Sequence, residues 1–240
     1  GGVEWTRFGG VPIADTLLQL SVEHIPFNTQ KARRHQPQPI PVPSSRKIPG
    51  SQRTYTQEAF WRVLDGVART VEPLAEGIVT TSPDVTVSTN LGGWVNRRGL
   101  FHRSTSTQHD LFSEGEVNSL RQWQSSPKGQ HLELGIAENN LFILLAAAGL
   151  SHSLFGERLL PIGTLYDPFI DRGLDALNYA CYQDARFILV ATPSGISLAP
   201  EGGAHQSSAT PLLGMAKPGL SAFEPAYADE LAVILRWSFE

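Results

Sequence analysis

Segments with the pattern of buried strands alternate with helical segments along most of the chain, and this alternation limits its possible folds. Residues 187–192, FILVAT, form a continuous apolar run of the kind found in parallel sheets. Further strands are expected at residues 84–89 (78–80 lead into this one), 131–134, 158–166 and 220–223, and helices at 56–70, 138–149, 169–183 and 226–239. Such alternation favours helices on both faces of a sheet. The sequence therefore predicts a three-layer α/β domain with a mostly parallel sheet.

Composition limits the functional classes. With 240 residues, 41% of them hydrophobic, the chain can bury one sizeable core. The net charge is −4 and the basic residues are not gathered on one segment, so we expect no nucleic-acid partner. The longest apolar run, residues 141–150, is too short to cross a bilayer, and no signal peptide is visible; we expect no membrane partner and a cytoplasmic location. The single cysteine, Cys181, excludes an internal disulfide and a multi-cysteine metal site.

The N-terminal region differs from the rest in composition. Residues 36–50, QPQPIPVPSSRKIPG, cannot hold a helix and contain little apolar surface. They predict an extended linker, or a strap over another domain, within an arm spanning residues 1–54. Residues 55–240 then form the globular domain. The beginning Gly-Gly without a Met indicates a fragment or a processed piece.

One carboxylate, Glu138, begins the most apolar helix of the chain. It lies in residues 131–150, HLELGIAENNLFILLAAAGL, where apolar residues cover every face, so this helix is expected to be buried all round and to end at Gly149. An acid in a first turn can serve the helix end alone, by satisfying free amides and the dipole. Alternatively, it is a desolvated carboxyl that exchanges a proton with a ligand.

Two other polar stretches could belong to a site. Residues 90–96 follow a predicted strand, where α/β sheets bind ligands, so they are either a wall of a site or a plain glycine turn. His102 and His109, with only Asp110 nearby, have poor spacing for a metal. We expect a mobile loop there and no metal ligands in this chain.

Three motifs carry a family resemblance. Residues 132–140, LELGIAENN, resemble the "GIAEQ" segment of transketolase-like, thiamin-diphosphate-dependent enzymes. Residues 195–206, GISLAPEGGAHQ, resemble the glycine-rich loop of that family. Residues 78–100, IVTTSPDVTVSTNLGGWVNRRGL, are most similar to the pyrimidine-binding region of homodimeric pyruvate dehydrogenase first components. The resemblance covers residues 55–240 and implies the pyrimidine-binding domain of such an enzyme.

This resemblance implies catalytic and cofactor-binding roles. Glu138 matches the carboxyl that hydrogen-bonds the pyrimidine ring of thiamin diphosphate, so that the aminopyrimidine can act as the base. Glu133 is a second choice, expected to support structure or to face a subunit neighbour. His205 matches the family histidine that reaches the substrate or intermediate, where it could stabilise an oxyanion.

An apolar, partly aromatic slot for the pyrimidine is implied at residues 163–169. Many relatives have aromatic residues there at a three-residue spacing. In our register Leu165 and Pro168 take those places, with Tyr166 and Phe169 shifted by one. Leu165, Tyr166 and Phe169 are therefore all candidates to bind the cofactor, and ordinary core packing is the alternative for Phe169.

The Mg²⁺-binding Gly-Asp-Gly motif of the family is missing from the sequence. We expect Mg²⁺ and the diphosphate to be bound by a domain not present in this chain, and this chain alone to be inactive. The resemblance implies a diphosphate-binding domain or subunit, a homodimer and a lipoyl-bearing acyltransferase as partners. Transketolase-type ketol transfer and a non-catalytic assembly or regulatory domain remain open as alternatives.

Overall fold

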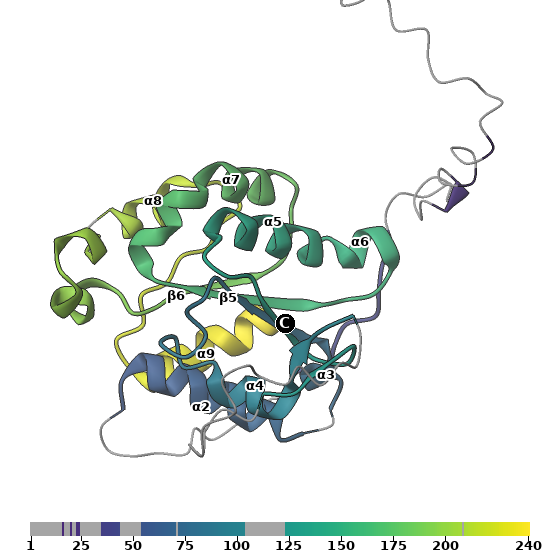
Figure 1. The fold of residues 1–240 in the computed structure, drawn as a ribbon, viewed down its shortest axis with the longest axis horizontal. Coiled ribbons are helices and arrows are strands. Elements are labelled where there is room, and N and C mark those ends of the chain that lie inside the picture. Colours follow the sequence, from purple (N-terminus) through teal and green to yellow (C-terminus); the bar gives the residue numbers. More distant parts are fainter. Residues whose placement is uncertain are drawn as a thin grey trace, which may run out of the picture.

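A parallel sheet forms the centre of the computed structural model, which describes residues 35–43, 54–70, 72–103, 123–207 and 209–240 with residues 16, 20, 23 and 24 (Figure 1). Its strands run in the order β3-β2-β4-β1-β5-β6 and every pairing is parallel. They are β1 (Ile78–Ser82), β2 (Leu100–Phe101), β3 (Ser125–Ser126), β4 (His131–Glu133), β5 (Leu160–Leu165) and β6 (Ile188–Ala191). β1, with β4 and β5 as neighbours, lies near the middle.

Helices cover both faces of the sheet (Figure 1). On one face lie α2 (Thr56–Ala68), α3 (Pro73–Gly77), α4 (Gly92–Arg98) and α9 (Ala228–Phe239). On the other lie α5 (Glu138–Gly149), α6 (Ser151–Phe155), α7 (Leu174–Tyr182) and α8 (Thr210–Ala216). Three short 3₁₀ helices, η2 (Asp167–Gly173), η3 (Gly195–Glu201) and η4 (Gly203–His205), follow β5 and β6. The predicted three-layer α/β fold with a parallel sheet is confirmed.

Side chains of β5 point alternately to the two faces of the sheet and so belong to two separate apolar cores. Leu160 and Ile162 pack with α2, α4 and α9, whereas Leu165 packs with α5 and α7 on the opposite face, because successive strand side chains point to opposite faces. Gly163 lies beneath α5, where an added Cβ would come within 2.6 Å of Leu145. The glycine therefore lets α5 approach the sheet closely.

Residues 35–43 of the arm have no regular structure. Ile40 and Val42 pack against the core cluster that contains α2. The His35 amide donates to the carbonyl of Ser153 at 3.0 Å. This part of the arm thus lies on the core of the globular domain. Most of the remaining arm is outside the described residues, as are residues 104–122 of the predicted mobile loop, including His109.

Two predicted strands are wrong. Residues 84–89 form turns, and the strand that precedes them is β1. Asp84 and Asn90 have φ of 62° and 61°, a left-handed conformation that Asp and Asn tolerate and that ends a strand. The Thr89 side chain donates to the Val85 carbonyl at 2.8 Å, a local bond that competes with a sheet. Residues 220–223 form no strand.

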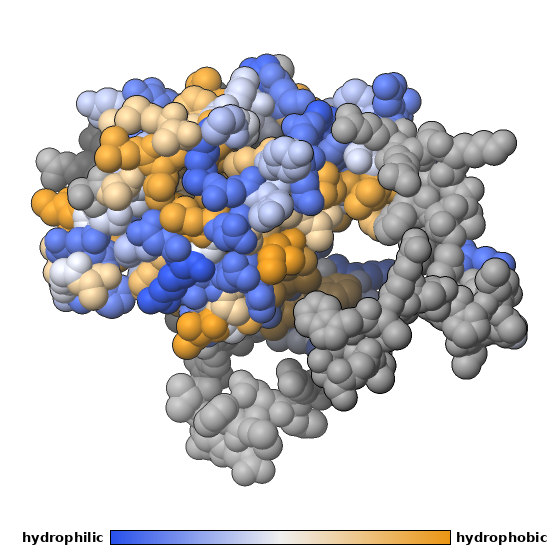
Figure 2. Space-filling model, turned by 90° about the horizontal axis from the view of Figure 1, so that it is seen from above, coloured by the Kyte–Doolittle hydropathy of each residue, from blue (hydrophilic) through white to orange (hydrophobic). Residues whose placement is uncertain are grey.

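The prediction that α5 is buried all round is also wrong. Leu141, Phe142 and Leu145 are fully buried against the sheet and α7, whereas Ile143 is 54% exposed on the outer side. Seen from the side of this helix layer, apolar side chains are interspersed with hydrophilic ones (Figure 2). The helix ends at Gly149, as expected.

Candidate active site

Three connections leave the carboxyl edge of the sheet close together. β4 leads to α5 and Glu138, β5 leads to Tyr166 and η2, and β6 leads to the loop that contains His205. Ligands of parallel α/β sheets bind at this edge. The edge is therefore where the side chains expected to be functional can meet.

Glu138 is the first residue of α5, and its side chain is only 9% exposed. Its Oε1 forms an ion pair with Nη1 of Arg172 in η2. The Arg172 side chain is 51% exposed, so one partner of this pair is shielded and the other faces solvent. A buried carboxylate with one half-exposed partner can exchange that partner for a ligand.

The sequence analysis did not identify Arg172. Its guanidinium carbon lies 3.8 Å from the ring centroid of Phe169, within the range of a cation–π contact. Arg172 thereby links the carboxylate to the aromatic residues. The available signal was a basic residue three positions after Phe169, which places both on one face of a helical turn.

Tyr166, Phe169 and His205 form a continuous row of rings. The Tyr166 and Phe169 rings are stacked, with centroids 5.7 Å apart and planes inclined by 12°. The His205 and Phe169 rings meet edge to face, with centroids 5.5 Å apart and planes inclined by 60°. Leu165 is fully buried in the core cluster against which Phe169 packs. Four of the expected site residues thus lie together, whereas the Leu165 side chain belongs to the core.

His205 has an unused polar atom. Among the described residues, no partner hydrogen-bonds its buried Nδ1. The histidine lies in η4, which follows Gly202 with φ of 91°. A buried ring nitrogen without a partner is costly unless a ligand or another chain satisfies it.

A second cluster holds the loop between β1 and α4. The Glu133 side chain, 30% exposed, accepts from the Asp84 amide at 2.8 Å and from the Thr86 hydroxyl at 2.5 Å. Burial raises the pKa of this carboxyl, but the nearby His131 imidazole and the hydrogen bonds from Thr86 and the Asp84 amide outweigh it, and the net pKa is lowered. Glu133 therefore supports the structure of this loop. Residues 92–96, which we expected to be a loop, begin α4.

Asp167, which directly follows Tyr166, is another buried carboxyl that sequence reasoning missed. It is 5% exposed. Burial raises its pKa, the charges of Glu224 and Asp171 raise it further, and a hydrogen bond from Thr210 partly opposes them. A protonatable group therefore lies beside the aromatic row.

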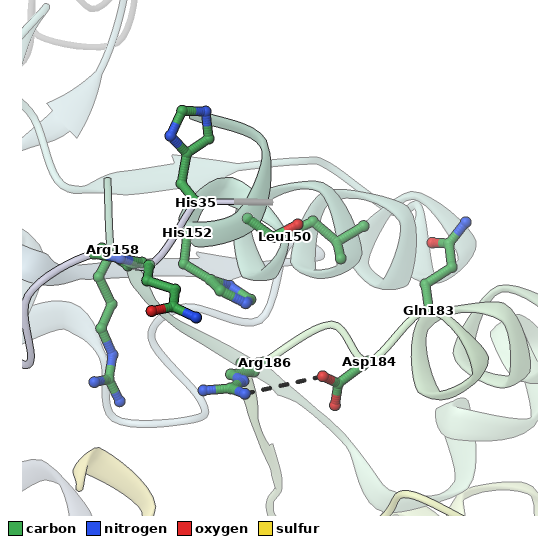
Figure 3. A pocket seen from close by; sticks show the side chains of 10 residues that line it. His35, Leu150, His152, Arg158, Gln183, Asp184 and Arg186 are labelled. Carbon is green, nitrogen blue, oxygen red and sulfur yellow. Dashed lines mark ion pairs between the residues drawn. The ribbon is translucent and has the colours of Figure 1, made fainter. Parts of the chain in front are cut away.

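A cavity of about 370 Å³ opens at the other edge of the sheet (Figure 3). Basic side chains line it, among them His152, Arg158 and Arg186, the last paired with Asp184 at 3.9 Å. The Nδ1 of His152 lies 2.9 Å from the Gly149 carbonyl at the end of α5. His152 thus satisfies a free carbonyl at the negative carboxyl end of α5, where basic residues are favourable.

The part of the chain that the structure describes offers no metal site, no membrane-spanning helix and no activated cysteine. No group of three or more His, Cys, Asp or Glu side chains could hold a metal ion there. No helix of that part is long and apolar enough to cross a membrane. Cys181 is half-buried, and burial raises the pKa of its thiol, so it is a poor nucleophile.

Comparison with known proteins identifies the family. The family model described as "Pyruvate dehydrogenase E1 component middle domain" matches residues 45–239. The pyruvate dehydrogenase E1 component of Pseudomonas aeruginosa is 28% identical over 213 residues, 85% of this chain and 24% of the relative. That of Corynebacterium glutamicum is 29% identical over 212 residues, 83% of this chain and 22% of the relative. The chain thus spans about a quarter of the length of these relatives.

Solved transketolases share the fold. The enzyme from Leishmania mexicana has a TM-score of 0.63 at 19% identity and covers 82% of this chain and 26% of its own. A Pichia stipitis transketolase in complex with sedoheptulose 7-phosphate has a TM-score of 0.64 at 18% identity, over 83% of this chain and 25% of its own. At this identity the likeness concerns the fold alone.

Proposed function

Because this chain belongs to the family of pyruvate dehydrogenase E1 component middle domains, we propose that it is the pyrimidine-binding part of a thiamin-diphosphate-dependent 2-oxo acid dehydrogenase. Pyruvate is the proposed substrate, with transfer of the acyl group to a lipoyl-bearing acyltransferase. The observation that carries the proposal is the meeting of buried Glu138 with Tyr166, Phe169 and His205 at one edge of the sheet.

The described residues fit the pyrimidine half of the cofactor. Glu138 offers a shielded carboxyl to a ring nitrogen, where it can accept a hydrogen bond or hold a proton. Tyr166 and Phe169 offer aromatic surface for the ring. Arg172, half exposed, can move off Glu138 without a large desolvation cost. Thiamin diphosphate, when bound, would supply a nucleophilic carbon and a cationic thiazolium ring able to delocalise the electron pair that decarboxylation leaves.

Beside the cofactor, His205 would meet the substrate. Its partnerless Nδ1, when it carries a proton, can donate to an oxygen of the oxo acid. A donor fixed in advance stabilises an oxyanion as its charge develops. The role assigned to His205 is therefore orientation and charge stabilisation at the carbonyl of the substrate.

The complete site would need more than this chain. The sequence has no Gly-Asp-Gly motif, and the described residues hold no metal-binding cluster. We place Mg²⁺ and the diphosphate in a diphosphate-binding domain or subunit, and propose a homodimer in which the two kinds of domain meet. This chain alone would then bind the cofactor weakly.

Calorimetry tests the proposal. Thiamin diphosphate with Mg²⁺ is titrated into this chain and into the longest polypeptide that contains it, each as wild type, Glu138→Ala and Glu157→Ala. Glu157 is an exposed residue before β5, at the far edge of the sheet, and serves as the matched control. We expect weak or no binding to this chain and tight binding to the longer protein, which Glu138→Ala weakens strongly and Glu157→Ala leaves unchanged.

Two results would count against the proposal. Tight binding to this chain alone would mean that the diphosphate site lies within it. Absence of binding to both polypeptides would favour a non-catalytic assembly domain. If the cofactor does bind, activity with pyruvate against activity with a ketose phosphate separates the dehydrogenase from a transketolase-type reaction.

A further inference from the structure

The loop between β1 and α4, residues 83–91, lies between the two halves of the candidate active site. β1 has β4 on one side and β5 on the other. β4 leads to Glu138 and β5 leads to Tyr166. Since the strands are parallel, the loop that follows β1 emerges between these two connections. Its position can therefore influence the spacing of both.

Hydrogen bonds tie the loop to both neighbouring strands. On the β4 side, the two carboxylate oxygens of Glu133 accept from the Asp84 amide and the Thr86 hydroxyl. On the β5 side, the hydroxyls of Thr89 and Thr164 are 2.8 Å apart, and both residues are fully buried. Thr164 lies two residues before Tyr166. The loop thus connects the strand that leads to the carboxylate with the strand that leads to the aromatic rings.

The hydrogen bonds by which Glu133 holds Asp84 and Thr86, here called the Glu133 clamp, continue into the interior through His131. Thr86 Oγ1 is 3.0 Å from His131 Nε2, and Thr80 Oγ1 is 2.8 Å from His131 Nδ1. His131 and Thr80 are 0% exposed. The distance between His131 Nε2 and Glu133 Oε2 is 3.7 Å, too long for a direct hydrogen bond. Thr86 therefore bridges the imidazole and the carboxylate.

Proton counting orders this chain of bonds. Thr86 has one hydroxyl proton, and the carboxylate of Glu133 takes it at 2.5 Å. Nε2 of His131 must then be the donor to Thr86. In the neutral ring Nδ1 accepts the proton of Thr80, for which Nδ1 at 2.8 Å is a nearer acceptor than the Gln130 carbonyl at 3.4 Å. The carboxylate thus selects the Nε2–H tautomer of the histidine. In this arrangement every polar side-chain atom from Thr80 through His131 and Thr86 to Glu133 has a partner.

We propose that Glu133, acting through Thr86 and His131, is a positioning residue that holds the β1–α4 loop at a fixed place between Glu138 and the aromatic residues. Its relevance to catalysis rests on the proposed function. The clamp itself does not, because it consists of contacts within this chain. Glu133 touches none of the candidate site side chains in the described contacts and acts only through the loop.

The tautomer gives a test that a packing role would not affect. In Glu133→Gln, the amide NH₂ replaces the acceptor Oε2 and donates to Thr86, whose proton then turns to His131 Nε2. The histidine should change to the Nδ1–H tautomer. ¹⁵N-histidine NMR of this chain would show the pyridine-type signal moving from Nδ1 to Nε2. Thr86→Ser, which keeps the hydroxyl, and Glu157→Gln, at the far edge, should leave the wild-type tautomer.

Hydrogen exchange and cofactor affinity test the positioning. The amides of Asp84, Thr89 and Leu91 should exchange together and about tenfold faster in Glu133→Gln, since a neutral acceptor replaces a charged one. In the longest polypeptide, the Kd for thiamin diphosphate should rise about tenfold in Glu133→Gln and stay unchanged in Glu157→Gln.

An unchanged tautomer, faster exchange at Asp84 alone, or an unchanged Kd would each overturn the proposal. Failure of the proposed function looks different. The wild-type longer polypeptide would then bind no cofactor, while the tautomer and exchange results on this chain would stand.

Discussion

Replacing Glu138 by Ala should separate function from stability. The substitution removes an ion pair in which the arginine is 51% exposed, and such pairs contribute about 0.2–1 kcal/mol. It also removes a first-turn acid at the start of a helix, which contributes about 0.3–1 kcal/mol. Relief from burying a carboxylate that is 9% exposed offsets part of both. We therefore expect a net loss of about 1 kcal/mol of unfolding free energy, or about 2–4 °C in Tm for a chain of this size.

The effect on cofactor binding should be much larger. A hydrogen bond to a charged group is worth about 1.5–3 kcal/mol, which corresponds to a Kd about 10- to 150-fold weaker in the longest polypeptide. Urea denaturation of this chain and calorimetry of the longer one give the two numbers. Leu145→Ala is the opposite control: that side chain is 0% exposed, and its loss should cost about 2–5 kcal/mol.

One pattern would refute this reasoning. If Glu138→Ala lowered the unfolding free energy by more than about 3 kcal/mol while each folded molecule kept wild-type cofactor affinity, Glu138 would be a structural acid. Its position at the site would then be incidental. Glu138→Gln, which keeps the shape of the side chain, checks that the outcome comes from the charge.

Two further predictions concern the surroundings of the site. Burial raises the pKa of Asp167 above its ordinary value of 3.8. Its contribution to stability is therefore present below that value and is lost as pH rises through the folded-state pKa. Asp167→Asn should be more stable than wild type at neutral pH and lose this advantage in acid; equal gains in thermal unfolding at both pH values would contradict the assignment. Gly149→Ala would place a Cβ 2.7 Å from the backbone N and O of Arg186 and should cost about 1–3 kcal/mol in urea denaturation, whereas Gly92→Ala, with no atom within 4 Å, should be neutral, and equal effects would show that the contact is unimportant.

Much of the fold could be predicted because periodicity is local. The apolar run at residues 187–192 predicted β6, and Gly149 predicted the end of α5. Residues 84–89 misled because alternating Val and Thr residues resemble a strand, whereas the left-handed conformations of Asp84 and Asn90 end it. The exposure of Ile143 could not be predicted, because composition shows how apolar a helix is and not which elements cover it.

The candidate site could be predicted only in part. Glu138, Tyr166, Phe169 and His205 were found through motifs, and no local pattern shows that they meet. The contact of Arg172 with Glu138 joins residues 34 apart on different connections. Such a contact depends on the order of strands in the sheet, which periodicity does not specify. The burial of Asp167 has the same origin, since its neighbours Thr210 and Glu224 lie far along the chain.

The close contact at Gly149 fixes the C-terminal end of α5 against the backbone of Arg186. Its twelve residues extend about 18 Å, from the backbone of Arg186 at the base to Glu138 at the tip. Because its buried side packs against the sheet and α7, the helix cannot tilt without disturbing the core. When a ligand arrives at the tip, the carboxylate acts as the fixed reference point. We therefore expect the half-exposed side chain of Arg172, and not Glu138, to move when a ligand binds.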